Sequence, residues 1–391
     1  MNATPRPKFS FRIERFGGDT AQRPLAVVAI PVKNEEDRIG RCLDSLAQQG
    51  GVDPAEVLVL LLLNNCSDRT AERVRDLAPQ LPFRLHVHHV DLPDPYANAG
   101  WARRLAMEAA VQAVDPAGLI LTTDADTLVD VDWIEANRRE VAAGVDAVAG
   151  YVMADPMELM ELDPGILERG ASEWEYQQLA AELEARLDPE PHDAWPRHNQ
   201  NCGASAAITA TAYRRIGGLP PKRVGEDRAL FEMLRRADLK VRHSLEVQVV
   251  TSARTDGRAL GGLSDAIRLR GEPNHPCDEA LEVAVAALRR ALWRGRLRAD
   301  WKAGRLDQLW EAWAARLEVT PTQFRRAMER PTFGELWADM EARSPRLERR
   351  LVTASMLKRE TRRMRRLVEA ARAQARADEA WSADAPQAAV A

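Results

Sequence analysis

The sequence predicts an α/β protein whose core is a mostly parallel sheet flanked by helices. Short apolar runs rich in β-branched residues start near positions 25, 57, 84 and 119, about 30 residues apart. Between these runs, apolar residues recur with helical spacing. This alternation is typical of successive right-handed βαβ units around a parallel sheet.

The first unit consists of a strand followed by a helix. Residues 25–30 (LAVVAI) are continuously apolar, as expected of a buried strand, and Pro31 ends the run. Asn34 and three acidic residues then precede a helical pattern, which predicts a helix capped by Asn34. The apolar face of that helix is formed by Ile39, Leu43 and Leu46.

The same order of elements continues along the first half of the chain. Further strands are expected at 57–63, 84–90 and 119–123. Ser67 or Asp68 is the expected cap of the helix after the second strand, and residues 101–114 form the next helix.

The remainder of the chain divides by pattern. Residues 155–200 are helical and rich in Glu, short strands and helices return over 201–252, and the chain beyond 265 is mostly helical. The expected domains are therefore a loose arm at 1–23, an α/β domain at 24–264 and a helical C-terminal extension at 265–391.

The composition excludes several classes of protein. Hydrophobic residues make up 45% and charged residues 29%, a composition that excludes a disordered chain. The net charge of −4 excludes a uniformly basic nucleic-acid binder. The longest apolar run, 57–63, is far shorter than the roughly 18 residues of a membrane helix. No apolar signal segment is expected at 1–16, and four widely spaced cysteines indicate reduced thiols in a cytoplasmic protein.

Polar clusters follow three of the expected strands, at 31–35, 64–68 and 123–127. Ligands of open parallel sheets bind at the carboxyl ends of the strands. Phosphate-loop and dinucleotide glycine signatures are absent from the sequence. In the third cluster, Asp124 and Asp126 can face one point, where carboxylate oxygens suit Mg²⁺ or Mn²⁺. A solvated turn is the alternative interpretation of this pair.

Five segments together resemble family 2 glycosyltransferases, which have the GT-A fold. In chain order they are AVVAIPVKNEEDRIGRCLDSL, LLLNNCSDRT, LILTTDADTLVDVDWI, NCGASAAITATAYRRIGGLP and VGEDRALFEMLRRADLKVRHS. The resemblance covers about residues 24–260 and follows the family's order of segments. It implies a GT-A-like, Rossmann-type sheet and a glycosyltransferase catalytic domain at 24–264.

The resemblance implies a set of donor-binding residues. Asn64 stands where the family usually has an Asp against the base, so the identity of the base stays open. Arg103, with Arg104 beside it, corresponds to the basic residue near the diphosphate, although surface charge on a helix explains these arginines equally well. The pair Asp124 and Asp126 would hold a divalent metal on the donor. The other implied donor residues are Pro31 and Glu35 in the nucleotide pocket, and Gly203, Ala204 and Ser205 beside the sugar.

The resemblance also implies the catalytic residues. Glu226 and Asp227 match the acidic pair that supplies the family's base, and Gly225 permits a tight turn before them. Asp227 is the expected base, while Glu226 binds the acceptor or orients the loop. Without the family context, an acidic first turn stabilised by the helix dipole would explain the pair.

Four further residues remain without a firm role. Some metal-dependent relatives add a His ligand after the acidic pair, but Thr251 lies near that position and His243 lies earlier, so no third ligand is assigned. Arg254 and Arg258 are interpreted either as contacts to phosphate or acceptor or as loop charges.

The implied activity is transfer of a sugar from a nucleoside-diphosphate sugar, UDP-linked, to a hydroxyl of a small molecule, glycan or lipid-linked acceptor, with Mn²⁺ or Mg²⁺. Most members invert the anomeric configuration, but related enzymes with similar acidic pairs retain it. Two alternatives are a non-catalytic sugar-nucleotide-binding protein and a nucleotidyltransferase. The latter needs a glycine-rich basic loop after the first strand, whereas residues 31–37 (PVKNEED) are acidic and lack glycine.

A basic segment lies near the C-terminus. Residues 343–366 contain ten Lys and Arg but only Glu348 and Glu360, a net charge of +8. The favoured interpretation is a solvated helix that pairs with acidic groups of the fold. Weak peripheral contact of this basic tail with an anionic membrane is the alternative.

Overall fold

The computed structural model describes residues 9–18, 22–257, 261–272 and 275–384. The chain forms two compact units. The sheet unit comprises Met1–Leu162 and Gln200–Arg268, and the helical unit comprises Asp163–Asn199 and Leu269–Ala391. Compared with the expected division at 264, the main difference is that residues 163–199 belong to the helical unit.

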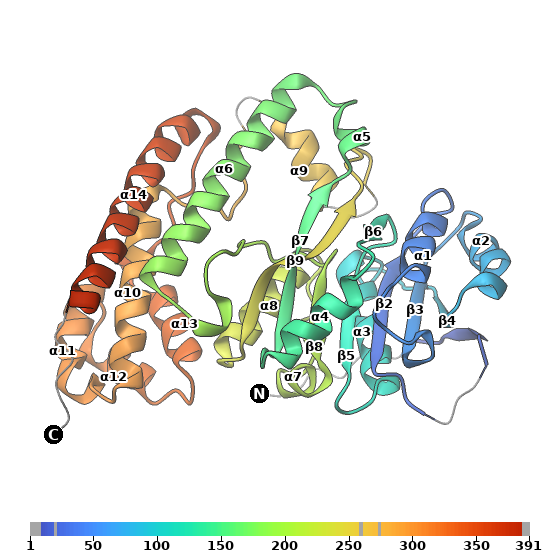
Figure 1. The fold of residues 1–391 in the computed structure, drawn as a ribbon, viewed down its shortest axis with the longest axis horizontal. Helices are drawn as coiled ribbons and strands as arrows, with labels where there is room; N and C mark the ends of the chain where they lie inside the picture. The colour runs from blue at the N-terminus through green and yellow to red at the C-terminus, as the bar shows by residue number, and fades with distance from the viewer. Residues whose placement is uncertain (1–8, 19–21, 258–260, 273–274, 385–391) are drawn as a thin grey trace. The chain divides into compact units, whose positions relative to one another are not determined.

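The sheet unit is built on nine strands within the described residues (Figure 1). Their order across the sheet is β1-β4-β3-β2-β5-β8-β7-β9-β6. The strands are β1 (Arg12–Phe16), β2 (Ala26–Val32), β3 (Val57–Asn64), β4 (Arg84–Val90), β5 (Leu119–Thr122), β6 (Thr127–Val129), β7 (Ala147–Ala154), β8 (Ala206–Thr209) and β9 (Val241–Thr251).

Six of these nine strands run in the same direction, which confirms the predicted α/β class with a mostly parallel sheet. The four adjacent strands β4, β3, β2 and β5 pair in parallel with one another. β8 then runs antiparallel between β5 and β7, while β7 and β9 return to the first direction. The carboxyl ends of β2, β3 and β5 therefore lie at one edge, as the predicted strands required.

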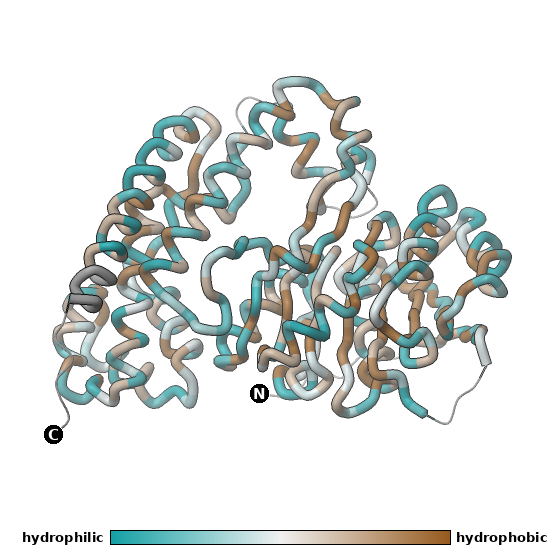
Figure 2. Tube along the Cα trace, viewed as in Figure 1, coloured by the Kyte–Doolittle hydropathy of each residue, from teal (hydrophilic) through white to brown (hydrophobic). Residues whose placement is uncertain are grey.

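Helices cover both faces of this sheet. One face packs against α1 (Ile39–Ala47), α2 (Thr70–Leu77) and α4 (Trp133–Ala142). The other packs against α3 (Ala99–Ala113), α7 (Ala210–Arg215) and α8 (Glu226–Arg236). All eight residues of β3 are buried, and Figure 2 shows the hydrophobic colour concentrated on these strands. A continuous apolar run therefore marks a strand that is covered on both faces.

Two local predictions were wrong. The helix expected to start at Asn34 begins at Ile39, because Asn34 adopts a left-handed φ of 54° and its side-chain oxygen accepts a hydrogen bond from the Ser67 amide instead. The arm expected at 1–23 contains β1, which pairs antiparallel with β4 and places Glu14 against Arg75. Residues 1–8 and 19–21 of that arm lie outside the described residues.

The helical unit confirms the predicted helical C-terminal region. Its core has two clusters: one lies between α6, α10 and α14, and the other joins α10 to the short helices. α9 (Leu263–Arg270) crosses the division between the units. The other helices are α6 (Pro164–Leu187), α10 (Ala284–Lys302), α11 (Leu306–Leu317), α12 (Pro321–Met328), α13 (Phe333–Arg343) and α14 (Ala354–Asp384).

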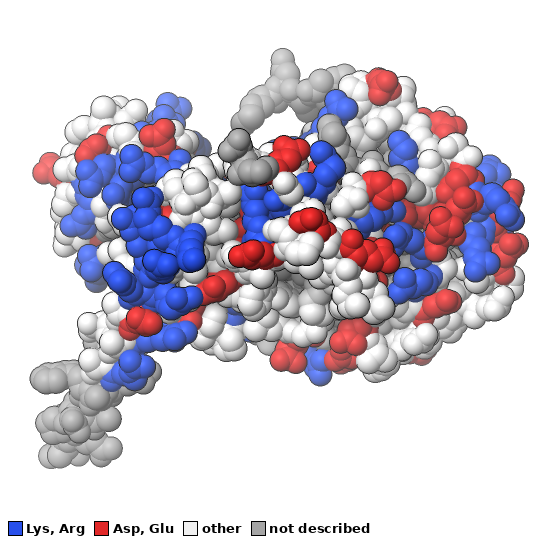
Figure 3. Space-filling model, turned by 90° about the horizontal axis from the view of Figure 1, so that it is seen from above, with Lys and Arg blue, Asp and Glu red and all other residues white. Residues whose placement is uncertain are grey.

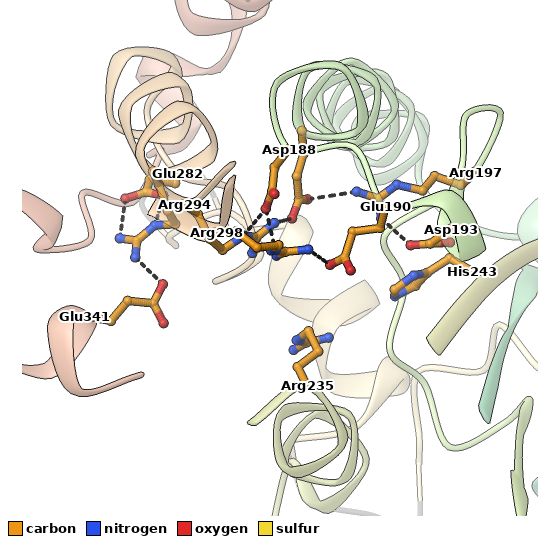
Figure 4. Close-up of polar contacts among 12 residues, drawn as sticks. Asp188, Glu190, Asp193, Arg197, Arg235, His243, Glu282, Arg294, Arg298 and Glu341 are labelled. Carbon is orange, nitrogen blue, oxygen red and sulfur yellow. Dashed lines mark hydrogen bonds and ion pairs between the residues drawn. The ribbon is translucent and has the colours of Figure 1, made fainter. Parts of the chain in front are cut away.

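A network of ion pairs joins the end of α6 to α10 (Figure 4). Asp188 accepts hydrogen bonds from Arg294 and, at 3.0 Å, from Arg298, and Arg298 also pairs with Glu190. The two helices approach closely, since a Cβ on Gly295 would lie 2.3 Å from the carbonyl oxygen of Leu187. These contacts explain why the chain after α6 belongs to the helical unit.

The basic tail lies largely on α14, and many of its arginines are paired. Arg359 and Arg363 bind the buried Glu360, and Arg365 binds Glu175 of α6. Figure 3 shows Lys and Arg side chains gathered over the helical unit. Exposed basic residues of α14 with no ion pair to a described residue are Lys358, Arg362, Arg366 and Arg376, and the first three belong to the basic tail. No helix of the described ranges combines the length and apolar character needed to cross a bilayer.

Candidate active site

Three strand ends of the sheet unit place acidic and basic groups together. Glu35 follows β2, Asp126 follows β5, and Arg254 follows β9. Arg254 donates through Nη1 and Nη2 to the two carboxylate oxygens of Glu35, at 2.9 and 2.5 Å. Its Nη2 also lies 2.9 Å from Oδ2 of Asp126. One guanidinium thus bridges carboxylates from two strands.

The environment of Asp126 disfavours its charged form. The side chain is 15% exposed. Burial and the nearby charge of Asp124 raise the pKa of Asp126 to about 6, although Arg254 acts in the opposite direction. Two carboxylates held this close need positive charge between or beside them to remain ionised together.

Arg103 of α3 is the second cationic centre. Its Nη2 donates to Asp124 Oδ1 at 2.5 Å, and its Nε donates to Glu226 Oε1 at 3.2 Å. Its Nη1 donates to Thr122 Oγ1 and to the carbonyl of Gly203, both at 2.9 Å. Burial lowers the pKa of Arg103, but attraction to Asp124 and Glu226 outweighs burial, so the pKa is raised overall. The expected contact of Arg103 with a diphosphate stays a prediction.

Gly203 allows the backbone to pass directly against this arginine. A Cβ at Gly203 would lie 2.6 Å from Cζ of Arg103, so any larger residue would displace the guanidinium. The amide of Gly203 donates to Asp227 Oδ2 at 3.0 Å. The glycine therefore connects Arg103 with the acidic pair at the start of α8.

The turn before α8 has the geometry that its sequence suggests. Gly225 is the N-cap of α8 and has a left-handed φ of 70°, a backbone conformation that residues other than glycine rarely adopt. Glu226 is buried against Arg103, whereas Asp227 is only partly buried. Asp227 accepts backbone hydrogen bonds from Gly203 and, at 2.7 Å, from Arg228. A carboxylate has about four acceptor positions, so Asp227 retains capacity for a further donor.

The neighbours of Gly203 belong to the sheet. The carbonyl of Ala204 accepts a hydrogen bond from Thr123 Oγ1 at 2.7 Å. Ser205 is buried and its Oγ accepts from the indole N–H of Trp133 at 3.0 Å. In this structure the Ser205 side chain points into the core, and its expected place beside a donor sugar remains a prediction.

The ends of β2 and β3 hold Pro31 and Asn64. Pro31 lies within β2 opposite Leu62 of β3. Asn64 is 3% exposed, and its side-chain oxygen has no hydrogen-bond partner among the described residues. A buried carbonyl oxygen without a donor is costly, so Oδ1 of Asn64 is suited to an N–H from a ligand.

The candidate third metal ligands are used elsewhere. Thr251 Oγ1 accepts from Thr127 Oγ1 at 2.8 Å, and His243 Nε2 lies 3.3 Å from Asn201 Oδ1. No group of three His, Cys, Asp or Glu side chains in the described ranges is arranged to hold a metal. Two carboxylates remain, and one or two protein carboxylates are typical of a Mg²⁺ site in which substrate phosphates supply further ligands. The donor set of Asp124 and Asp126 therefore fits such a metal.

Arg254 is the residue that sequence reasoning left ambiguous. The structure places it against Glu35 and Asp126, whereas its sequence position indicated only a loop charge or a ligand contact. Arg258, named with it, lies outside the described residues. The usable signal is that Arg254 stands three residues after a strand end, near the expected third ligand.

Comparison with known families relates part of the chain to an enzyme family. Residues 27–196 match the family model described as glycosyl transferase family 2. This part of the chain is therefore similar to family 2 glycosyltransferases. The match includes Asp124 and Asp126 but ends before Gly203, Glu226 and Asp227. A comparison with curated protein sequences finds no significant match.

Solved structures similar to this chain are remote in sequence. TarS from S. aureus in complex with UDP-GlcNAc is 14% identical, with 90% of this chain and 92% of that chain covered and a TM-score of 0.45. The mannosyltransferase PcManGT from Pyrobaculum calidifontis, in complex with GDP-Man and Mn²⁺, is 17% identical, with coverage of 84% and 88% and a TM-score of 0.42. Glucosyl-3-phosphoglycerate synthase from Mycobacterium tuberculosis, with Mn²⁺ and UDP, is 16% identical, with coverage of 64% and 79% and a TM-score of 0.38.

Proposed function

We propose that this enzyme transfers a sugar from a UDP-linked donor to an acceptor hydroxyl, with a divalent metal and inversion of the anomeric configuration. One observation carries the proposal. The buried guanidinium of Arg103 ties Asp124, on the donor side, to Glu226, on the acceptor side, in a single cluster. Binding groups for a diphosphate and a base for a hydroxyl are thereby held within one constellation.

Asp124 and Asp126 would hold Mn²⁺ or Mg²⁺ on the donor. The metal, when bound, neutralises the departing diphosphate as a Lewis acid. Arg103 orients Asp124 through a 2.5 Å hydrogen bond, which limits the positions that this carboxylate can take. The side chain of Asp124 is 35% exposed, which leaves it accessible to a ligand from solvent.

Asp227 would act as the general base. Glu226 is held by Arg103 and is 9% exposed, so its charge is already committed inside the protein. Asp227 is oriented by two backbone amides and is more accessible. Its carboxylate would take the proton from the acceptor hydroxyl as that oxygen attacks the anomeric carbon. Direct displacement of this kind inverts the configuration.

Asn64, Pro31 and Glu35 would line the nucleotide pocket. The unpaired Oδ1 of Asn64 favours a base that presents an N–H, as uracil does at N3. Gly203, Ala204 and Ser205 would border the sugar through their backbone. The acceptor would be a small molecule, a glycan or a lipid-linked hydroxyl. A cytoplasmic location is also proposed, since none of the four cysteines, all within the described ranges, forms a disulfide.

Thermal unfolding with a panel of nucleoside diphosphates and their sugars, with and without Mn²⁺, tests the proposal. UDP compounds should raise the melting temperature most, and more so with Mn²⁺, because ligands that bind only the native state stabilise it. Asp126→Ala should remove the metal-dependent part. Asp132→Ala, at an exposed ion pair with Arg139, is the matched control and should not change it. A protein that no nucleoside diphosphate stabilises would contradict the proposed donor.

A further inference from the structure

Arg254 holds its two carboxylates unequally. Both terminal nitrogens point to Glu35 in a bidentate arrangement, which is the strongest geometry for an arginine and a carboxylate. Asp126 shares only Nη2, through one of its two oxygens. Arg254 can therefore release Asp126 while its paired contact with Glu35 stays intact.

The guanidinium is not fully satisfied by the protein. Its Nε is buried and has no hydrogen-bond partner among the described residues. Its side chain is 11% exposed, so water does not readily replace the missing acceptor. Nε of Arg197 and Arg298 in the helical unit is also without a partner among the described residues, so the contacts of Nη1 and Nη2 are what distinguish Arg254.

From these contacts we infer that Arg254 competes with the divalent cation for Asp126. This inference rests on the proposed metal site at Asp124 and Asp126. A guanidinium 2.9 Å from Asp126 already supplies the positive charge that the metal would bring. Two cations on one carboxylate repel each other strongly in a poorly solvated site.

The competition makes metal binding depend on the nucleotide. A metal ion alone must overcome the charge of Arg254, whereas a metal on a diphosphate arrives with compensating negative charge. Arg254 therefore selects the metal–donor complex over the free ion. Because coupling between two ligands is reciprocal, the same residue increases the gain in nucleotide affinity that the metal produces.

Binding of Mn²⁺ alone tests the inference, since the electron paramagnetic resonance signal of free Mn²⁺ is lost on binding. Arg254→Gln should bind Mn²⁺ about tenfold or more tightly than the wild type, because a full positive charge is removed. Arg254→Lys keeps the charge and should stay within about threefold of the wild type. Arg139→Gln, which breaks the exposed pair with Asp132, is the matched control and should show no change.

A second measurement places the effect at Asp126. Adding Asp126→Asn to Arg254→Gln should remove the gain in Mn²⁺ affinity. Calorimetry gives the affinity for UDP with and without Mn²⁺, and the ratio of the two affinities should be smaller in Arg254→Gln than in the wild type. Circular dichroism checks the fold of each variant. If Arg254→Gln unfolds, Arg254→Lys still tests the inference, because a tenfold gain in Mn²⁺ affinity in Arg254→Lys would contradict the role of charge.

The outcomes separate this inference from the proposed function. If Arg254→Gln binds Mn²⁺ no more tightly than the wild type, or if neither protein binds Mn²⁺, Arg254 does not compete with the metal. A gain that survives Asp126→Asn also overturns it, because the metal then lies elsewhere. Failure of UDP to bind the wild type would instead contradict the proposed donor, while the measurement with Mn²⁺ alone still decides the role of Arg254.

Discussion

The two units both contain buried arginine–carboxylate clusters, but the balance of charge differs. In the helical unit, Arg197, Arg294 and Arg298 face four carboxylates between α6 and α10: Glu184, Asp188, Glu190 and Asp193 (Figure 4). In the sheet unit, Arg103 and Arg254 pair with four within the described residues, Glu35, Asp124, Asp126 and Glu226, and a fifth carboxylate, Asp227, binds the nearby Gly203 amide. The site therefore has the larger negative excess, which a cation would neutralise.

The clusters also differ in the elements that carry them. The helical cluster joins helix side chains, with Gly295 permitting the close approach of α10 to the end of α6. The sheet cluster collects groups from loops that follow strands, where a ligand has access. The first arrangement is suited to stability and the second to binding. Substitutions in the two clusters should accordingly affect different measurements.

The largest expected effect is that of Asp227→Asn on turnover. A general base typically contributes 10²–10⁴-fold to rate, and Asn cannot accept the acceptor's proton, so kcat should fall by about that factor. Donor affinity should change little, because its contacts come from other segments. Glu226→Gln should cost less or mainly raise the KM of the acceptor.

Activity assays of these variants require a fold control, because both residues start α8. Circular dichroism and thermal unfolding should match the wild type if the cluster in the sheet unit serves binding. A folded Asp227→Asn with turnover within a few-fold of the wild type would exclude Asp227 as the base and direct attention to Glu226.

Arg294→Ala should have the opposite pattern. Removing this arginine leaves Asp188 with Arg298 and Glu184 with Arg197 as arginine partners among the described residues, and breaking such a buried pair should lower the free energy of unfolding by up to about 3 kcal/mol. Arg365→Ala breaks the exposed pair with Glu175 and should cost less than about 1 kcal/mol. Denaturant unfolding measures both, and UDP affinity should be unchanged. Equal losses in the two variants would contradict a structural role for the buried cluster.

The sequence predicted the main strands because burial on both faces leaves an unmistakable pattern. β3 is the clearest case, with eight buried residues in a row. Asp124, Asp126, Glu226 and Asp227 could be named because strand ends and a glycine turn mark them. Local polar pairing was harder to predict: Asn34 resembled a helix cap, but its side chain binds the Ser67 amide across 33 residues of chain.

Long-range partners of arginine were beyond sequence reasoning. Arg254 lies 219 positions from Glu35, and no local spacing relates the two. The contacts of α6 with α10 and α14 could not be predicted for the same reason. Arginines are plentiful in this chain, so their positions alone do not distinguish a buried bridge from a surface charge.

An exposed pair at the edge of the sheet offers a smaller test of the comparison. Hydrogen bonds from Arg75, together with its charge and that of His89, hold the pKa of Glu14 at about 2 despite some burial. Because the pKa of Glu14 is lower in the folded state, the ion pair stabilises the fold above about pH 4.5, and this stabilisation is lost as the pH falls toward 2. Solvent screening limits this contribution to less than about 1 kcal/mol.

Glu14→Gln should therefore lower stability slightly at pH 7 and flatten the pH dependence between about 4.5 and 2. Chemical unfolding at several pH values measures the difference from the wild type. Asp53→Asn, a cap of a short turn in the same unit, is a suitable control because it lacks an arginine partner. An unchanged pH profile in Glu14→Gln would show that the β1–β4 pairing does not depend on this ion pair.

The smallest effect concerns the exposed face of α14, where Lys358, Arg362 and Arg366 lie four residues apart without ion pairs to described residues. If this face contacts an anionic membrane, the full chain should sediment weakly with anionic vesicles at low salt. The contact should fade near physiological salt, since exposed charges are screened over about 8 Å. Replacing the three residues with Gln should abolish sedimentation, whereas Arg359→Gln, next to its partner Glu360, should reduce it less.

Binding that resists salt would require apolar insertion, which this charged face does not offer. No sedimentation of the wild type at low salt would leave α14 as a solvated helix, whose charges are balanced where they meet Glu175 and Glu182 of α6.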